Sequence, residues 1–198
     1  TSNLTGRNED FSQELMIYDV KERALFQATN DPEGFGESSA PAVSGNGKFV
    51  VFVSSSNLGG GLNPDNVSAV WIRRKSGYSM LVTANSSGPF DAEQPTIDWD
   101  GEWIGFVARE DLVGRNPDRS PEIFLYNRQR KTFTQVTSNP PGCRILGPKL
   151  TATGGRVVFR SNCDPLGTNP DRGDEVFWAT NPAKHLVVEA EGSVELVV

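Results

Sequence analysis

Short apolar runs, separated by polar stretches rich in glycine and proline, recur along the whole chain. Three runs are almost continuously apolar, which indicates strands covered on both faces: residues 49–53, 103–107 and 157–159. A second kind of apolar run contains an aromatic residue in each copy: residues 15–18, 70–72, 123–126 and 176–178. More polar runs follow these, as is typical of an exposed sheet edge: residues 25–29, 80–83 and 133–137. The pattern predicts an all-β protein.

Identical residues return at spacings of 53–55, which identifies an internal repeat. A proline opens three copies, at Pro41, Pro95 and Pro148, and a glycine follows each of them six residues later. An Asn-x-Asp motif occurs four times, starting at Asn8, Asn63, Asn116 and Asn169. Each period is expected to form four antiparallel strands, named A to D. Strand A begins at the proline, and a glycine turn joins it to strand B as a hairpin.

A four-stranded sheet repeated radially is a blade of a β-propeller. The sequence therefore predicts a single β-propeller fragment, 1–198, of about three and a half blades. The partial copy 1–29 holds strands C and D only; the complete copies are 30–83, 84–137 and 138–190, and 191–198 adds one apolar strand. Since a ring needs about four blades, we expect the chain to be part of a larger ring. The alternative is a small protein of four repeat units that closes on itself or is capped at its exposed edge.

Composition and charge narrow the class of partner. Glycine and proline supply 20 and 13 of the 198 residues, which suits short strands joined by turns. The net charge of −6 argues against nucleic acid or an anionic membrane surface as the partner. No run of 18 apolar residues occurs, so no membrane span is expected. The chain starts at Thr1 without a signal peptide, and we expect a mature fragment.

The segment 41–54 reads Pro-x-apolar-Ser-x-x-Gly-x-x-apolar-apolar-Phe-x-Ser and resembles the repeat of TolB-like propellers of secreted and periplasmic bacterial proteins. The Glu-apolar-aromatic steps that start at Glu122 and Glu175 fit the same repeat. Asp98 and Ala108 depart from it, at a turn and a strand end. The resemblance covers essentially the whole chain. It implies a propeller that binds another protein, with no chemistry of its own.

The two cysteines flank one predicted hairpin. Cys143 lies 11 residues before Gly154, near the hairpin tip, and Cys163 lies 9 residues after it. We therefore expect a disulfide at the open end of the hairpin, which implies a periplasmic or extracellular location. The alternative is two unpaired, small apolar residues in a reducing cell. Two thiols and one distant histidine do not make a tetrahedral metal site.

Catalytic motifs are scarce. His185 is the only histidine, near the start of the last strand D, and no Gly-x-Ser-x-Gly nucleophile elbow occurs. Walker-type and dinucleotide-binding glycine motifs are absent, and the glycines at 59–61 are interpreted as a flexible turn. We expect no enzymatic activity and no cofactor.

The Asn-x-Asp loops are the candidate metal sites. Their possible ligands are spaced like the start of a calcium loop: Asn116, Asp118 and Glu122 in one copy, Asn169, Asp171 and Glu175 in the next. Val67 and Ala69 replace such ligands in an earlier copy, and Arg119 and Arg172 bring positive charge. We favour side chains that cap a tight turn, with bound calcium as the weak alternative.

Blade geometry places the long B–C and D–A loops on one face of the ring, where binding usually resides. We expect a protein partner to bind there through residues of the D–A loops: Phe35, Glu37, Phe90, Asp91 and Glu93. Alanine in place of Phe35 and Phe90 is expected to weaken binding without unfolding the protein. The alternative is that these loops are merely solvated.

The favoured function is a non-enzymatic binding or scaffold module of a secreted or periplasmic protein that mediates a protein–protein interaction. One alternative is the regulatory propeller of a larger hydrolase, such as a prolyl oligopeptidase-like peptidase. Another is a sugar- or calcium-binding propeller. Self-association through the open blade edge is a further alternative.

Overall fold

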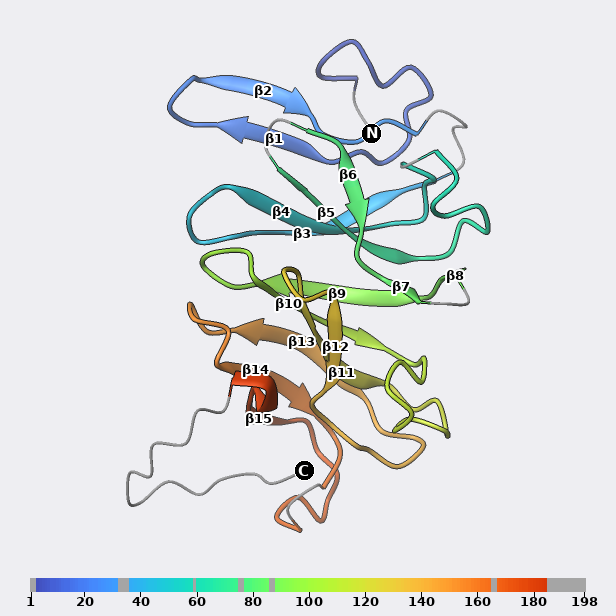
Figure 1. The fold of residues 1–198 in the computed structure, drawn as a ribbon, viewed down its shortest axis with the longest axis vertical. Coiled ribbons are helices and arrows are strands. Elements are labelled where there is room, and N and C mark those ends of the chain that lie inside the picture. Colours follow the sequence, from blue (N-terminus) through green and yellow to red (C-terminus); the bar gives the residue numbers. More distant parts are fainter. Residues whose placement is uncertain are drawn as a thin grey trace.

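The computed structural model describes residues 3–31, 36–58, 60–74, 77–85, 88–164 and 167–184. Four antiparallel sheets are stacked along the longest axis of the molecule, with the N-terminal sheet at one end and the C-terminal sheet at the other (Figure 1). One short 3₁₀ helix, η1 (Pro182–Lys184), follows the last described strand. Among the described residues, no helix has the length and apolar character needed to cross a membrane.

The strands follow the predicted repeat. The first sheet holds β1 (Met16–Asp19) and β2 (Ala24–Gln27). Blade 2 holds β3 (Ser38–Val43), β4 (Phe49–Ser54), β5 (Ala69–Arg74) and β6 (Ser79–Leu81). Blade 3 holds β9 (Ala92–Ile97), β10 (Trp103–Ala108), β11 (Glu122–Asn127) and β12 (Thr132–Gln135). Blade 4 holds β13 (Ile145–Leu150), β14 (Arg156–Ser161) and β15 (Glu175–Thr180).

Two predicted strands lie outside the described residues: the last strand D, with His185 at its start, and the extra strand within 191–198. An unpredicted hairpin of β7 (Ala84–Asn85) and β8 (Gly88–Pro89) lies in the loop between blades 2 and 3. The all-β fold with four-stranded blades is thus confirmed.

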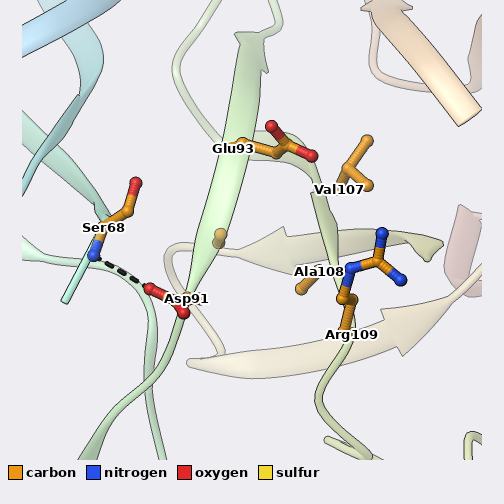
Figure 2. Close-up of a pocket in the computed structure, with 7 residues that line it drawn as sticks. Ser68, Asp91, Glu93, Val107, Ala108 and Arg109 are labelled. Carbon is orange, nitrogen blue, oxygen red and sulfur yellow. Dashed lines mark hydrogen bonds between the residues drawn. The ribbon is translucent and has the colours of Figure 1, made fainter. Parts of the chain in front are cut away.

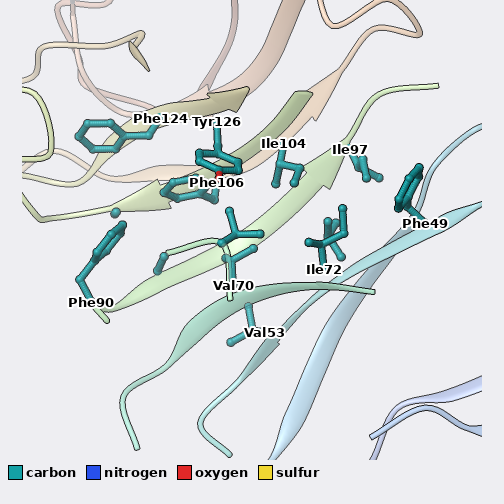
Figure 3. Close-up of a cluster of buried hydrophobic side chains, with 14 residues drawn as sticks. Phe49, Val53, Val70, Ile72, Phe90, Ile97, Ile104, Phe106, Phe124 and Tyr126 are labelled. Atoms are coloured by element: carbon teal, nitrogen blue, oxygen red, sulfur yellow. The ribbon is translucent and has the colours of Figure 1, made fainter. Parts of the chain in front are cut away.

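Each blade has a front face toward the preceding sheet and a rear face toward the following one. In blade 2 the front face carries Val50, Phe52 and Trp71, which pack against the first sheet. Its rear face carries Phe49, Val51, Val53, Val70 and Ile72. These rear residues pack against the front face of blade 3, which carries Ile104, Phe106, Phe124 and Tyr126 (Figure 3). The same scheme joins blades 3 and 4. Burial on both sides explains why β4, β10 and β11 lack a polar alternation.

The inner strands begin three residues earlier than predicted. Pro41, Pro95 and Pro148 lie within β3, β9 and β13 rather than at their starts. The residue before each proline has a left-handed backbone: Ala40 at φ 48°, Gln94 at φ 54° and Gly147 at φ 60°. The strand register shifts at the same place, which identifies a β-bulge in each blade. A bulge leaves a residue outside the hydrogen-bond ladder, so proline fits there without breaking the sheet.

The predicted disulfide is present: Cys143 and Cys163 are bonded, with their Cα atoms 5.4 Å apart. It closes the open end of the β13–β14 hairpin and a loop with a sequence separation of 20.

Replacing both cysteines with serine is expected to lower the free energy of unfolding by about 2–3 kcal/mol, because the unfolded chain gains loop entropy. Urea titration of the double variant and the oxidised protein measures this difference. Adding a reductant should bring the parent protein to the stability of the variant. A variant as stable as the parent would contradict the expectation.

Candidate functional site

A buried carboxylate fixes the loop face of blade 3. Glu122, at the start of β11, is 1% exposed and accepts hydrogen bonds from four donors on three residues. The hydroxyls of Ser120 and Thr137 donate at 2.9 and 2.5 Å, and the backbone and side-chain amides of Asn139 donate at 2.6 and 2.9 Å. Burial raises the pKa of Glu122, and these hydrogen bonds partly oppose the rise. The carboxylate thereby joins strand C to the start of the D–A loop.

The first sheet repeats this arrangement. Glu14 accepts hydrogen bonds from the hydroxyls of Ser12 and Thr29 and from the backbone N–H of Asp31. Glu175 occupies the same repeat position in blade 4 but is exposed. Ala69 occupies it in blade 2, where Asp91 reaches back instead and accepts a hydrogen bond from the backbone N–H of Ser68 at 3.0 Å. A carboxylate therefore ties each of these three D–A loops to the beginning of strand C, near the start of the loop in the first sheet and blade 3 and at the end of the loop in blade 2.

The Asn-x-Asp side chains stabilise their own turns. The side-chain amide of Asn116 donates to the carbonyls of Arg109 and Ser120, at 3.1 and 2.9 Å. Asn63 and Asn169 donate to the matching carbonyls of their loops. Asp118 accepts from the backbone N–H of Ser120, and its carboxylate lies 3.0 Å from the Ser120 hydroxyl. These bonds agree with the interpretation of the Asn and Asp side chains as caps of a tight turn. Across the described residues, no three His, Cys, Asp or Glu side chains gather at metal-binding distance.

One part of this cap varies among the copies. In blade 3 the Ser120 hydroxyl lies 3.2 Å from the Asn116 side-chain oxygen, one of several acceptors that share its single hydrogen. Gly173 occupies the same position in blade 4, and the buried side-chain oxygen of Asn169 has no hydrogen-bond partner. The three atoms nearest to a Cβ at Gly173 belong to the Asp171 side chain, at ordinary contact distances of 3.5–3.8 Å.

Gly173→Ser is therefore expected to raise the free energy of unfolding by about 1 kcal/mol, through a new hydrogen bond and a less flexible unfolded chain. Thermal melting of the variant and the parent measures the change. Gly173→Ala, which has no hydroxyl, should give less than half of this increase in the free energy of unfolding. Equal melting temperatures for the two variants would show that the hydroxyl contributes nothing.

The predicted partner-binding residues do not form one exposed set. Glu37, Asp91 and Glu93 are exposed on the loop face, whereas Phe35 lies outside the described residues. The prediction that Phe90 is exposed is wrong, because this residue is only 5% exposed. Its ring lies 6.4 and 6.0 Å from the rings of Phe106 and Phe133, within the core between blades 2 and 3 (Figure 3). The predicted outcome for Phe90→Ala changes accordingly, from lost binding to lost stability.

Asp91 and Glu93 flank a groove of about 250 Å³ at the loop end of strands β9 and β10 of blade 3, beside Ser68 of blade 2 (Figure 2). Its floor is apolar and buried, from Ala92, Val107 and Ala108. Ser68 and Arg109 complete the lining. The hydrogen bond from Ser68 fixes the Asp91 carboxylate, and the Glu93 carboxylate projects over Val107 (Figure 2). The groove thus places two carboxylates and one guanidinium around an apolar floor.

Sequence reasoning identified Asp91 and Glu93 but not Ser68 or Arg109. Ser68 precedes β5 of blade 2, and Arg109 follows β10 of blade 3, 41 positions later in the printed sequence. The one available signal was the predicted placement of B–C and D–A loops on the same face. It does not say which loops meet across a blade boundary.

No model of a known protein family matches the sequence, and no curated protein matches it. Solved structures do match. TolB from Acinetobacter baumannii has a TM-score of 0.57 at 17% identity, over 89% of this chain and 38% of that one. The tricorn protease matches with a TM-score of 0.55 at 16% identity, over 96% and 18% of the two chains. An oligogalacturonate lyase in complex with manganese matches with a TM-score of 0.56 at 11% identity, over 87% and 43%.

The fold is a β-propeller. The identities are too low to transfer a function, and the three matched proteins are a protease, a lyase and TolB. The chain spans less than half the length of each of them.

Proposed function

We propose that this propeller is a non-enzymatic binding module and that its groove at the loop end of blade 3 receives a basic side chain of a protein partner. The observation that carries the proposal is the pair of carboxylates, Asp91 and Glu93, over an apolar floor. A lysine or arginine side chain matches both parts, because its aliphatic stem packs on apolar surface while its charge meets carboxylates.

The size of the groove supports a side chain rather than a whole small molecule. Pockets for drug-sized ligands have volumes of about 300–1,000 Å³, whereas this groove measures about 250 Å³. Arg109 at its edge suits a carbonyl or carboxylate of the partner's backbone. The net charge of −6 favours a basic partner over an acidic one. The disulfide supports a periplasmic or extracellular location.

The test is a nuclear magnetic resonance titration with two blocked tripeptides, acetyl-Ala-Lys-Ala-amide and acetyl-Ala-Glu-Ala-amide. The lysine peptide should shift the amide signals of Val107 and Ala108, with a dissociation constant on the order of 1 mM at low salt. Raising the ionic strength to about 0.5 M should weaken the shifts, because salt screens exposed charges.

Glu93→Gln should weaken the lysine-peptide shifts at least threefold. Glu37→Gln is the matched control, an exposed carboxylate on the same face but outside the lining of the groove, and should leave the shifts unchanged. Equal responses to both peptides, or no response to the lysine peptide, would overturn the proposed site.

A further inference from the structure

The short turns that join strands A to B and strands C to D lie at one end of the sheets, opposite the loops that hold the groove (Figure 1). Backbone hydrogen bonds join the A–B turns of blades 2, 3 and 4 into a row. The N–H of Asn46 donates to the carbonyl of Trp99 at 3.0 Å, and the N–H of Trp99 donates to that of Ala152 at 2.9 Å. The Arg128 side chain ties the C–D turn of blade 3 to the same row, through the carbonyl of Gly101.

These turns form a surface, the turn face, whose charge is opposite in sign to that of the whole chain. It comprises residues 19–23, 44–48, 73–74, 77–78, 98–102, 127–131, 151–156 and 180–184. The turn face holds 10 lysines and arginines and 5 acidic residues, a formal charge of +5, whereas all other residues of the chain sum to −11. The net charge of −6 averages over this separation. It therefore does not exclude an anionic partner at the turn face.

The cations of the turn face are more exposed than its acids. The exposed acids there are Glu22 and Asp100. Asp98 is 3% exposed and accepts hydrogen bonds from two backbone N–H groups, and the half-buried Glu102 accepts one from the side chain of Asn127. The first sheet, blade 2 and blade 3 contribute six exposed cations: Lys21, Arg23, Lys48, Arg74, Arg130 and Lys131. Exposed cations thus outnumber exposed acids by three to one across these sheets.

Two large aromatic side chains project from the same face. Tyr78 lies in the C–D turn of blade 2 and is 98% exposed, and Trp99 lies in the A–B turn of blade 3 and is 54% exposed. The Trp99 ring lies against Gly45, where a Cβ atom would overlap it. Tyrosine and tryptophan concentrate at the headgroup level of membranes, because each ring is apolar and carries one polar atom that stays hydrated. Such rings among lysines and arginines are typical of a surface that binds lipid headgroups.

We propose that the turn face binds an anionic lipid bilayer, with its cations among the headgroup phosphates and Tyr78 and Trp99 at the headgroup level. Neighbouring sheets pack about 10 Å apart, so the cations spread over several headgroups rather than converging on one ligand. The Cys143–Cys163 bond supports a compartment outside the cytoplasm, where lipid rather than nucleic acid supplies an extended anionic surface. The bilayer repels the acidic loop end, so the bound molecule presents its groove away from the membrane.

Flotation of the full chain with lipid vesicles tests the proposal. Phosphatidylcholine vesicles that contain about 40% phosphatidylglycerol should carry the protein upward through a density gradient, whereas pure phosphatidylcholine vesicles should not. Raising the ionic strength from about 0.05 M to about 0.5 M should release the protein, because salt screens the attraction. A protein that binds neither kind of vesicle, or both equally, would overturn the proposal.

Arg130→Gln with Lys131→Gln removes two cations from the turn face and should weaken vesicle binding about 25-fold, since each basic residue contributes about fivefold. Arg115→Gln with Arg172→Gln is the matched control at the loop end. All four residues are exposed, and Arg172 has a left-handed backbone like Lys131, at φ 53° and 56°. The control changes the net charge equally and should bind like the parent. Equal losses in the two double variants would show that total charge drives binding, and would overturn the proposed surface.

Tryptophan fluorescence locates the contact. Trp71 and Trp103 are buried, whereas Trp99 is exposed on the turn face. The emission of the protein should shift to shorter wavelength on binding to phosphatidylglycerol vesicles, because the Trp99 ring leaves water. Trp99→Phe should abolish this shift while the vesicles still carry the protein. Binding with an unchanged emission spectrum of the parent would place a different surface on the membrane and contradict the assignment.

A single-stranded oligonucleotide distinguishes a bilayer from other polyanions. Oligothymidylate of about 20 nucleotides should bind at least tenfold more weakly than the vesicles at the same salt concentration. Tighter binding of the oligonucleotide, lost in Arg130→Gln with Lys131→Gln, would identify a nucleic-acid site and overturn the lipid assignment. Glu93→Gln, which tests the groove, should leave vesicle binding unchanged, so the two proposals fail separately.

Discussion

Replacing Phe106 with alanine is expected to lower the free energy of unfolding by about 4 kcal/mol, the largest single effect that we predict. Phe106 is fully buried on the front face of blade 3. Its ring centre lies 6.2 Å from those of Phe124 and Phe133 and 6.4 Å from that of Phe90. The alanine variant leaves a cavity bounded by three aromatic rings, which relaxes poorly because both blades hold its walls.

Urea titration at 25 °C measures this loss. Tyr78→Ala removes an aromatic ring that is 98% exposed, and it should change the stability by less than about 0.5 kcal/mol. If Phe106→Ala cost no more than Tyr78→Ala, the packing between blades 2 and 3 would not be the main source of stability that the structure indicates.

Glu122→Ala is expected to lower the free energy of unfolding by about 3 kcal/mol at neutral pH. Its removal leaves the Thr137 hydroxyl and two amides of Asn139 without their acceptor, whereas the Ser120 hydroxyl keeps other oxygens within reach. Glu175→Ala is the matched control, since the same repeat position is exposed in blade 4, and it should change the stability by less than about 0.5 kcal/mol.

The stability lost in Glu122→Ala should depend on pH, and the direction of the change follows from the pKa of Glu122. Because burial raises the pKa of Glu122, the folded protein holds this proton more tightly than the unfolded chain does. The contribution of Glu122 is therefore greatest below its ordinary pKa and declines as the pH rises through the raised value. The stability lost in Glu122→Ala should be larger near pH 4 than near pH 7, in urea titrations at both values. An equal loss would contradict the raised pKa.

The sequence predicted most of the fold because the repeat supplies its own alignment. Strands B and C of blades 2 and 3 are apolar on both faces, and Gly47, Gly101 and Gly154 all adopt the left-handed turn conformation at φ 67–72°. The Cys143–Cys163 bond followed from its place at the open end of one hairpin. Each of these features is local in sequence or repeated from copy to copy.

The candidate site was predicted less well, for identifiable reasons. Phe90 belongs to a D–A loop, and loops are commonly exposed, but the β7–β8 hairpin precedes it and its ring is buried between two blades. Ser68 of blade 2 joins the groove across a blade boundary, and spacing along one chain does not give that distance.

The stacking of sheets also sets how the molecule loses its structure. Each inner blade has two neighbours, whereas the first sheet and blade 4 have one each among the described residues. In such a linear array the end units open first and protection from hydrogen exchange grows toward the middle. The amides of β10 and β11 should therefore exchange more slowly than those of β1 and β2. The groove lies in this slowest region, so a partner bound there would contact the part of the protein that remains ordered while its ends fray.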